Sequence, residues 1–226
     1  YWLLINDGIY AANQDVPQVD GATRTYNGIT IQGGDPNWRD LNGDNRINDQ
    51  DKSLMGNIFP KVVGGFNNQF GYGNWSLGIN FYFNLGRKVV NEEMANRFNF
   101  INREGVVGIT SVKEISFWEK RGDYSKYPLY NPWSTVMPYH SNQDPFLENA
   151  SFLKLRTVSI GYDLSDCLKR KSSKIDHLYI YGTVNNIFTI TPYSGRDPEL
   201  INYTGYDSGY GMAIPMTYTI GLKVDL

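Results

Sequence analysis

The twelve residues D-L-N-G-D-N-R-I-N-D-Q-D place oxygen-bearing side chains at the spacing of a calcium-binding loop. Asp40, Asn42 and Asp44 stand at its first, third and fifth positions. Arg46 at the seventh position offers its backbone carbonyl, and Asp51 closes the loop at the twelfth. Because calcium takes roughly six to eight oxygen ligands, this set predicts a bound cation, with calcium the first choice and magnesium the second. Its expected role is to stiffen an exposed loop.

Two positions depart from the calcium-loop pattern. Asn45 stands where such loops carry glycine, although asparagine tolerates the left-handed backbone conformation. Asp51 stands where they carry glutamate, and its shorter side chain reaches less far. The same letters also describe an Asp/Asn/Gly turn that caps itself through side-chain hydrogen bonds. Both interpretations stay open on the sequence.

A second set of candidate residues is aromatic and lies in the long segment 86–149. Aromatic rings offer flat faces to sugar rings and to peptide side chains. Four of them are therefore candidates for ligand binding: Trp118, Tyr124, Trp133 and Tyr139. The alternative, which we favour, is that these rings pack the loop itself or an interface with a partner.

Composition excludes several classes of protein. A net charge of −2 gives no reason to expect a nucleic-acid partner. The single cysteine, Cys167, rules out an internal disulfide, and no Ser/His/Asp or Cys/His constellation for nucleophilic catalysis is evident. We therefore expect no enzyme activity and no organic cofactor. The sequence also lacks an apolar run of about 18 residues, so it predicts no membrane-spanning helix.

Apolar and polar residues alternate along several segments, as in β-strands with two different faces. The clearest runs from Trp75 to Leu85, where odd-numbered positions are apolar. A tilted strand of roughly 9–11 residues is long enough to cross a bilayer. Between Leu155 and Val158 the alternation changes parity, which a β-bulge would reconcile. The expected strands are residues 1–8, 62–72, 75–85, 152–164, 178–188 and 216–226.

The connections between these strands alternate in length. Residues 71–74 and 166–173 form short turns, whereas residues 9–58, 86–149 and 191–213 form long loops. Long outer loops and short periplasmic turns are typical of outer-membrane barrels. The predicted fold is all-β: about six strands of a large antiparallel transmembrane β-barrel with long extracellular loops. A soluble β-sandwich also alternates, but it rarely carries structureless loops of this length.

Four blocks of sequence resemble those of the SusC/RagA-type TonB-dependent outer-membrane transporters. The first two are G-D-P-N-W-R-D-L-N-G-D-N-R-I-N-D-Q-D and I-F-P-K-V-V-G-G-F-N-N-Q-F. The other two are L-E-N-A-S-F-L-K-L-R-T-V-S-I-G-Y and Y-I-Y-G-T-V-N-N-I-F-T-I-T-P-Y-S-G-R-D-P-E-L. They occur in the family's order and spacing and cover about half of the chain. Leu226 stands where the family usually ends in phenylalanine, but the alternation is kept.

The resemblance implies a barrel of about 22 strands with a folded plug in its lumen. It implies TonB-driven import of glycans or peptides across the outer membrane of a Gram-negative, Bacteroidetes-like bacterium. A SusD-like surface lipoprotein would cap the barrel, and outer-membrane lipid would surround it. We expect residues 1–226 to be the C-terminal part of the barrel. The plug, the TonB-contacting segment and the earlier strands would then precede Tyr1.

A second function remains open on the sequence. The chain could be a secreted, calcium-stabilised β-sheet module that binds carbohydrate or a partner domain. The two functions differ in what the apolar rows contact. A soluble module buries its apolar face against a second sheet, whereas a barrel turns that face to lipid.

Overall fold

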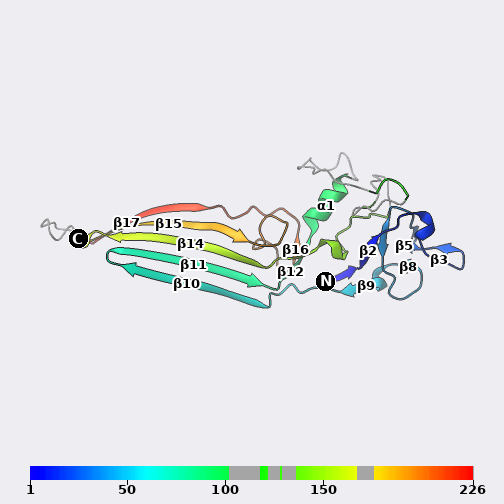
Figure 1. The fold of residues 1–226 in the computed structure, drawn as a ribbon, viewed down its shortest axis with the longest axis horizontal. Coiled ribbons are helices and arrows are strands. Elements are labelled where there is room, and N and C mark those ends of the chain that lie inside the picture. The colour runs from blue at the N-terminus through cyan, green and yellow to red at the C-terminus, as the bar shows by residue number, and fades with distance from the viewer. Residues whose placement is uncertain (102–117, 122–127, 129–135, 167–175, 226) are drawn as a thin grey trace. The chain divides into compact units, whose positions relative to one another are not determined.

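The computed structural model of the chain describes residues 1–101, 118–121, 128, 136–166 and 176–225. These residues form two compact units (Figure 1). Unit 1 comprises Tyr1–Ile58, Val89–Glu148 and Asn202–Gly209. Unit 2 comprises Phe59–Lys88, Asn149–Ile201 and Tyr210–Leu226.

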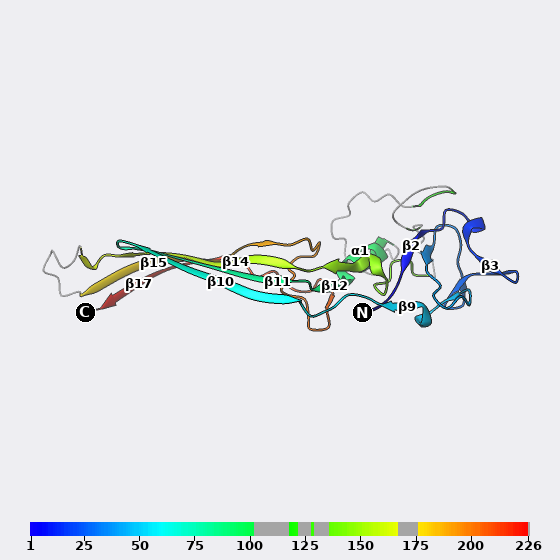
Figure 2. The same ribbon diagram turned by 60° about the horizontal axis from the view of Figure 1, so that its bottom comes forward.

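Unit 2 is built on one antiparallel sheet of five strands, in the order β10-β11-β14-β15-β17. Figure 2 shows these strands as a single layer. Each strand is 9 to 14 residues long, which meets the length that a tilted membrane strand requires. The strands are β10 (Val62–Tyr72), β11 (Trp75–Leu85), β14 (Phe152–Asp163), β15 (His177–Ile190) and β17 (Thr217–Asp225). The prediction of strands in these five segments is confirmed.

The sheet has one apolar and one polar face. Successive side chains of a strand point to opposite faces, and directly paired residues of neighbouring strands point to the same face, so the alternation of each strand continues across the sheet. The alternation predicted from the sequence is confirmed, and the apolar side chains remain exposed within unit 2. The exposed apolar side chains on this face include Phe66, Phe70, Trp75, Ile160, Ile180, Phe188, Tyr218, Ile220 and Leu222. A contiguous exposed surface of this kind marks an interaction with lipid or with another protein.

The change of parity in β14 is a β-bulge, as predicted. Leu155 pairs with Phe81, but Thr157 pairs with Asn80, so Arg156 has no partner of its own on β11. The pairing of β14 with β15 shifts at the same place. One extra residue returns the apolar side chains on both sides of the bulge to the same face.

The turn between β10 and β11 is short, as predicted. Tyr72 pairs with Trp75, which leaves only Gly73 and Asn74 in the loop. Gly73 has a φ of 57°, in the left-handed region that glycine enters without strain.

Residues 1–8 do not form a strand of the main sheet, and that prediction is corrected. β1 (Trp2–Leu4) pairs with β9 (Lys52–Leu54), and β2 (Asn6–Ile9) pairs with β7 (Pro36–Trp38), all within unit 1. The physical reason is the burial of two successive side chains, Leu3 and Leu4, which are 0% and 2% exposed. A strand with one face to lipid and one to water would expose them on opposite sides.

Unit 1 consists of short strands, three single turns of 3₁₀ helix and one α-helix. The remaining strands are β3 (Gln18–Val19), β4 (Ala22–Thr23), β5 (Thr25–Tyr26), β6 (Ile29–Thr30), β8 (Arg46–Ile47), β12 (Lys88–Asn91), β13 (Leu147–Asn149) and β16 (Tyr206–Asp207). The 3₁₀ turns are Asn13–Asp15, Asp49–Asp51 and Asp144–Phe146. The segments predicted as long loops therefore contain ordered structure and two apolar clusters of their own.

The helix α1 (Glu92–Ile101) begins after Asn91, whose side-chain oxygen accepts a hydrogen bond of 2.9 Å from the backbone N–H of Met94. Such an interaction caps one of the free N–H groups at a helix start. Within the described part of the chain, no helix is long and apolar enough to span a membrane.

A buried amide holds the first residues of unit 1 to the segment before β13. The Gln143 side chain, 1% exposed, donates to the carbonyls of Pro138 (2.7 Å) and His140 (3.1 Å). Its Oε1 accepts from Trp38 Nε1 and Asn6 Nδ2, both at 2.9 Å. All four hydrogen-bonding positions of the amide are thus occupied, which is what a buried amide requires.

Among the described ionisable groups of unit 1, His140 and Asp35 have the largest pKa shifts, and both lie outside the strands of the main sheet. His140 stacks on Tyr26 and Trp38, with ring centroids 5.6 and 5.2 Å away. Burial and the charge of Lys52 lower the pKa of His140 to about 4. Burial raises the pKa of Asp35 to about 6, although a hydrogen bond from the Gln32 N–H acts in the opposite direction.

These two shifts predict opposing pH dependences. The unfolded chain binds more protons at His140 between about pH 4 and 6.5, so this group weakens folding as the pH falls through that window. Folded Asp35 binds more protons between about pH 3.8 and 6, so it weakens folding as the pH rises. We expect the two slopes, each at most about 1.4 kcal/mol per pH unit, to offset one another in the wild type.

Single substitutions should separate the two slopes. In the Asp35→Asn variant, unit 1 is expected to lose stability as the pH falls from 6.5 to 4. His140→Phe keeps the ring stack, and in this variant unit 1 is expected to lose stability as the pH rises from 4 to 6. Amide hydrogen exchange of residues 25–47, compared with the wild type at each pH, measures both. Parallel pH profiles in the two variants would contradict the prediction.

Candidate functional site

The polar face of the main sheet carries a row of amides and hydroxyls at the level of the bulge. The residues are paired directly from strand to strand, and so point the same way. Across β10, β11, β14, β15 and β17 they are Asn67, Asn80, Thr157, Asn185 and Thr217. On β14, β15 and β17 the side chains of the row are hydrogen-bonded: Thr157 Oγ1 donates to Asn185 Oδ1 (3.0 Å), and Asn185 Nδ2 donates to Thr217 Oγ1 (3.3 Å).

The segment after β15 folds back onto this face. We call residues 191–201 the strap. Its Tyr193, Asp197 and Ile201 are buried, and Pro198 is fully enclosed. The guanidinium of Arg87 donates to the carbonyls of Pro198 and Ile201, both at 3.4 Å.

A buried lysine anchors the strap to the polar face. Lys154, 3% exposed, pairs across the sheet with Tyr82, which places its side chain on the polar face. Its Nζ lies 2.7 Å from Glu199 Oε2 and 3.4 Å from Asp197 Oδ2. A buried ammonium of this kind is tolerated because two carboxylates compensate it.

The bulge residue Arg156 joins the same cluster. Its guanidinium is paired with Glu199 and lies 4.1 Å above the centre of the Tyr82 ring. Two cations and two carboxylates therefore meet with no net charge. The bulge accounts for the position of Arg156, since an extra residue in a strand re-aims its side chain.

A cavity of about 460 Å³ opens beside Arg156. The polar row forms one wall through Thr157, Asn185 and Thr217, and the strap contributes Glu199. Its volume falls in the range of small-molecule sites, roughly 300–1,000 Å³. The cavity lies wholly within unit 2, on the polar face.

The end of the sheet near the short turns has a different character. On the polar face the Tyr179 ring covers Gly161 and the Tyr181 ring covers Gly221, so that a Cβ at either glycine would collide with the ring. The Tyr179 hydroxyl is 2.6 Å from Ser76 Oγ. Such coverage of a strand glycine by an aromatic ring restores packing that the glycine lacks.

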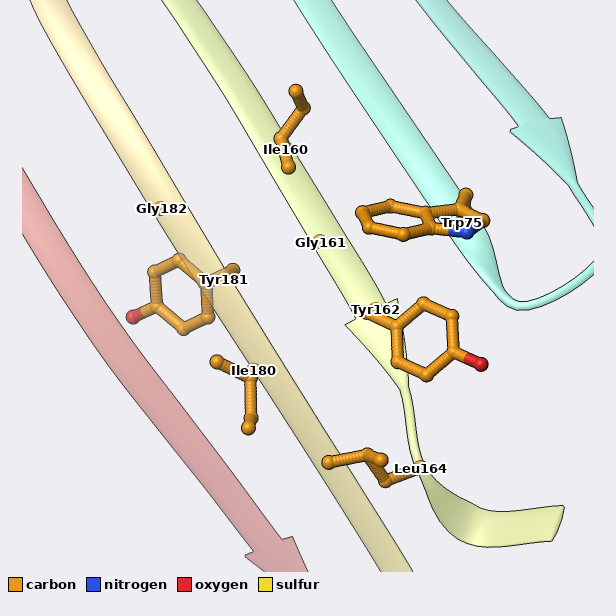
Figure 3. Close-up of a pocket in the computed structure, with 8 residues that line it drawn as sticks. All are labelled: Trp75, Ile160, Gly161, Tyr162, Leu164, Ile180, Tyr181 and Gly182. Carbon is orange, nitrogen blue, oxygen red and sulfur yellow. The ribbon is translucent and has the colours of Figure 1, made fainter. Parts of the chain in front are cut away.

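The apolar face at this end holds a shallow groove of about 390 Å³, shown in Figure 3. Trp75 of β11 and Tyr162 of β14 lie side by side there, with ring centroids 4.8 Å apart. Ile160, Ile180 and Leu164 supply the aliphatic lining. Aromatic rings gathered at one end of an apolar strand face are typical of the interfacial girdle of a membrane barrel.

The predicted cation loop is a network of side-chain caps. Asp40 accepts from the N–H groups of Gly43 (2.7 Å) and Asn45 (2.9 Å), and its carboxylate is 3.3 Å from Arg24. Asp51, fully buried, accepts from the N–H groups of Leu41 and Asn48, both at 2.9 Å. Asn45 has a φ of 61°, the left-handed conformation expected at that position.

The remaining predicted ligands, Asn42 and Asp44, each accept a hydrogen bond from the backbone N–H two residues later. Arg46 lies in β8, beside β5. In the described residues, no three His, Cys, Asp or Glu side chains are grouped to hold a metal ion. The geometry matches the self-capping turn, and the cation stays a prediction.

The aromatic residues that were candidates for ligand binding have different surroundings. Tyr139 is 2% exposed and packs with Leu3, Val90 and Phe146, so its side chain belongs to a core cluster. Trp118 is partly exposed, with a buried indole N–H that lacks a hydrogen-bond partner in the described part of the chain. Tyr124 and Trp133 lie outside the described residues. Neither Tyr139 nor Trp118 lines the polar cavity.

Comparisons with known proteins identify the kind of sheet to which these features belong. TonB-dependent receptor P39 of Formosa agariphila is 28% identical over 195 residues, which cover 85% of this chain and 18% of the relative. TonB-dependent receptor SusC of Bacteroides thetaiotaomicron is 26% identical over 192 residues, covering 82% and 17%. No family model matches the chain.

Two solved structures share the fold. One is the RagAB peptide importer in its open-open state, with a TM-score of 0.64 and 18% identity over all of this chain and 22% of that one. The other is the RagAB peptide transporter, with a TM-score of 0.65 and 17% identity over 98% and 22%. The chain is related to the SusC/RagA-type TonB-dependent receptors. It corresponds to part of their barrel.

The chain spans less than a fifth of the length of these curated receptors. The relatives are named as receptors, and the structural neighbours as a transporter, rather than as enzymes. In a SusC/RagA-type barrel the five strands of unit 2 are a continuous piece of wall, with the polar cavity on one side and the aromatic groove on the other.

Sequence reasoning missed the main residues of the polar cluster on this sheet: Lys154, Arg156, Asp197 and Glu199. Two signals were present. The parity change at Arg156 predicted a bulge, and bulges re-aim side chains. Lys154 stood at an inward position of a strand otherwise rich in apolar residues, where a charge needs a partner.

The cation prediction is tested by one substitution. Asp44→Ala removes a predicted ligand and one cap, at the backbone N–H of Arg46. If calcium binds, the wild-type loop becomes resistant to protease when calcium is added, and the variant does not. Asp49→Ala is the control, because Asp49 lies outside the predicted ligand set and is exposed. Equal proteolysis of the wild type in calcium and in excess chelator would contradict cation binding.

Proposed function

We propose that this chain forms part of the wall of an outer-membrane barrel that imports glycans or peptides in a TonB-dependent manner. The observation that carries the proposal is the two-faced sheet, with apolar side chains exposed across five strands and amides, hydroxyls and ion pairs opposite them. The similarity to TonB-dependent receptors supports it. The apolar face would contact outer-membrane lipid, and the polar face would line the lumen.

The proposal includes two protein partners and an orientation. A SusD-like lipoprotein would cap the barrel, and TonB would act through a part of the receptor not present in this chain. The short turns would lie in the periplasm, with the ordered segments of unit 1 outside. Barrel wall of this kind has no catalytic role, and a calcium ion would stiffen an outer loop.

Uptake by the full-length receptor tests the function. Cells that carry the receptor are expected to accumulate a labelled oligosaccharide or peptide from a mixed panel, and to lose this uptake when TonB is deleted. The lipoprotein is expected to copurify with the receptor in detergent. Uptake that is unchanged without TonB, or extraction of the receptor without detergent, would refute the proposal.

Labelling of two cysteines tests the orientation. Val19→Cys lies at the exposed end of β3 in unit 1, and Asn74→Cys lies in the turn between β10 and β11. In a Cys167→Ser background, a membrane-impermeant maleimide is expected to label position 19 on intact cells. Position 74 is expected to react only after the outer membrane is opened. The reverse pattern would invert the orientation.

A further inference from the structure

Irregular backbone on two neighbouring strands builds the cavity beside Arg156. The bulge at Arg156 coincides with a register shift on β15. Next to that shift, Asn186 has a φ of 54°, which is rare for a residue other than glycine. Such features cluster where a strand must present particular side chains to a ligand. Both Arg156 and Asn186 line the cavity.

The charge of the cavity selects against ions. Arg156 and Glu199 are paired with each other at its wall. An anionic ligand approaching Arg156 would meet the Glu199 carboxylate, and a cationic ligand approaching Glu199 would meet the guanidinium. Neither kind finds an unopposed partner, so the walls suit a neutral ligand.

The hydrogen-bonding groups of the cavity suit a ligand that both donates and accepts. Thr217 Oγ1 accepts from Asn185, so its own O–H remains able to donate. Thr157 Oγ1 donates to Asn185, so its lone pairs remain able to accept. Adjacent sugar hydroxyls provide this mixture on one rigid ring. Guanidinium and carboxylate groups can each bind two neighbouring hydroxyls.

The cavity has little apolar lining, which argues against a peptide as its ligand. Among the lining residues only Ile214 is aliphatic, and the nearby Tyr82 ring is covered by Arg156. The apolar side chains of a peptide would therefore find little apolar surface in this cavity. The C–H face of a single sugar ring requires no more apolar surface than Ile214 offers.

We propose that this cavity is a saccharide subsite on the inner wall of the barrel, which binds one neutral sugar unit through its hydroxyls. The proposal rests on the proposed function, because that function makes the polar face the inner face. It also selects glycan over peptide as the cargo that contacts this wall. Thr157, Asn185 and Thr217 would hold the sugar hydroxyls, with Arg156 and Glu199 at one side.

Calorimetric titration of the purified full-length receptor tests the subsite. The probes are hexasaccharides of glucose, mannose, xylose and fructose, with tryptic peptides of casein as the rival ligands. The wild type is expected to bind at least one of the saccharides. Thr217→Val, which removes one hydroxyl and keeps the shape, is expected to weaken that binding about tenfold, and Asn185→Leu at least as much.

Thr219→Val is the matched control. Thr219 lies one pleat further along the same face of β17, opposite Thr183, and does not line the cavity. Its saccharide affinity is expected to equal that of the wild type. Hydrogen exchange of the strap, measured on all variants, separates loss of a ligand contact from disruption of the wall.

The outcomes separate this proposal from the proposed function. Saccharide binding that is unchanged in Thr217→Val and Asn185→Leu would overturn the subsite and leave glycan import intact. Binding of peptides alone would overturn it and leave peptide import intact. Saccharide binding that depends on these residues in a receptor with no TonB-dependent uptake would support the subsite and refute the transport function.

Discussion

Replacement of Lys154 by methionine is expected to release the strap from the polar face. The change leaves Asp197 and Glu199, 8% and 22% exposed in their side chains, without the ammonium that compensates them. Removing one partner of a buried ion pair typically costs about 3–5 kcal/mol. We therefore expect the backbone amides of residues 193–201 to lose most of their protection from hydrogen exchange in the detergent-solubilised receptor.

A neutral double variant is the control for this effect. Lys154→Met combined with Asp197→Asn removes the cation together with one carboxylate, and it leaves Arg156 paired with Glu199. It is expected to recover much of the protection, since replacing a buried ion pair by uncharged groups is often nearly neutral. If the single variant keeps a fully protected strap, the ion pairs do not anchor it.

Replacement of Gln143 by leucine is expected to disrupt unit 1. Leucine makes none of the four hydrogen bonds of the amide, so the Trp38 indole N–H and the Pro138 carbonyl are left buried without partners. Each unsatisfied buried group costs about 1–3 kcal/mol. The expected loss of stability is about 3 kcal/mol or more, visible as faster hydrogen exchange of residues 1–47.

The neighbouring amide provides the control for Gln143. Asn142 is exposed, and only its backbone carbonyl is used, as the acceptor for the N–H of Leu4. Asn142→Leu is therefore expected to change the stability of unit 1 by less than about 0.5 kcal/mol. Equal effects of the two substitutions would mean that the buried hydrogen bonds of Gln143 do not hold the unit together.

The main sheet could be predicted from the sequence because its pattern is local. A period of two over eleven residues, from Trp75 to Leu85, determines both the strand and its two faces. The bulge was predictable for the same reason, because it changes that period within four residues. The first segment was assigned wrongly because Leu3 and Leu4 are both buried, and a short apolar run has no period to read.

The strap and the cavity depend on pairings that are distant in sequence. Lys154 meets Asp197 and Glu199 across 43 and 45 residues. In the sequence, R-D-P-E-L has the composition of an ordinary exposed turn. Gln143 meets Asn6 across 137 residues in the same way. Tyr139 was a candidate for ligand binding and is a core residue instead, because composition does not distinguish an aromatic ring that binds a ligand from one that packs in a core.

The two tyrosine–glycine contacts on the polar face bear on how the barrel assembles without misaligned strands. Hydrophobic alternation rejects a slip of one residue, since every side chain would change face, but it tolerates a slip of two. Such a slip of β17 would bring Thr219 or Lys223 opposite Tyr181 in place of Gly221. The Cβ of either would enter the volume that the ring fills. The tyrosine rings therefore disfavour a register shift of two residues, which the hydrophobic pattern does not prevent.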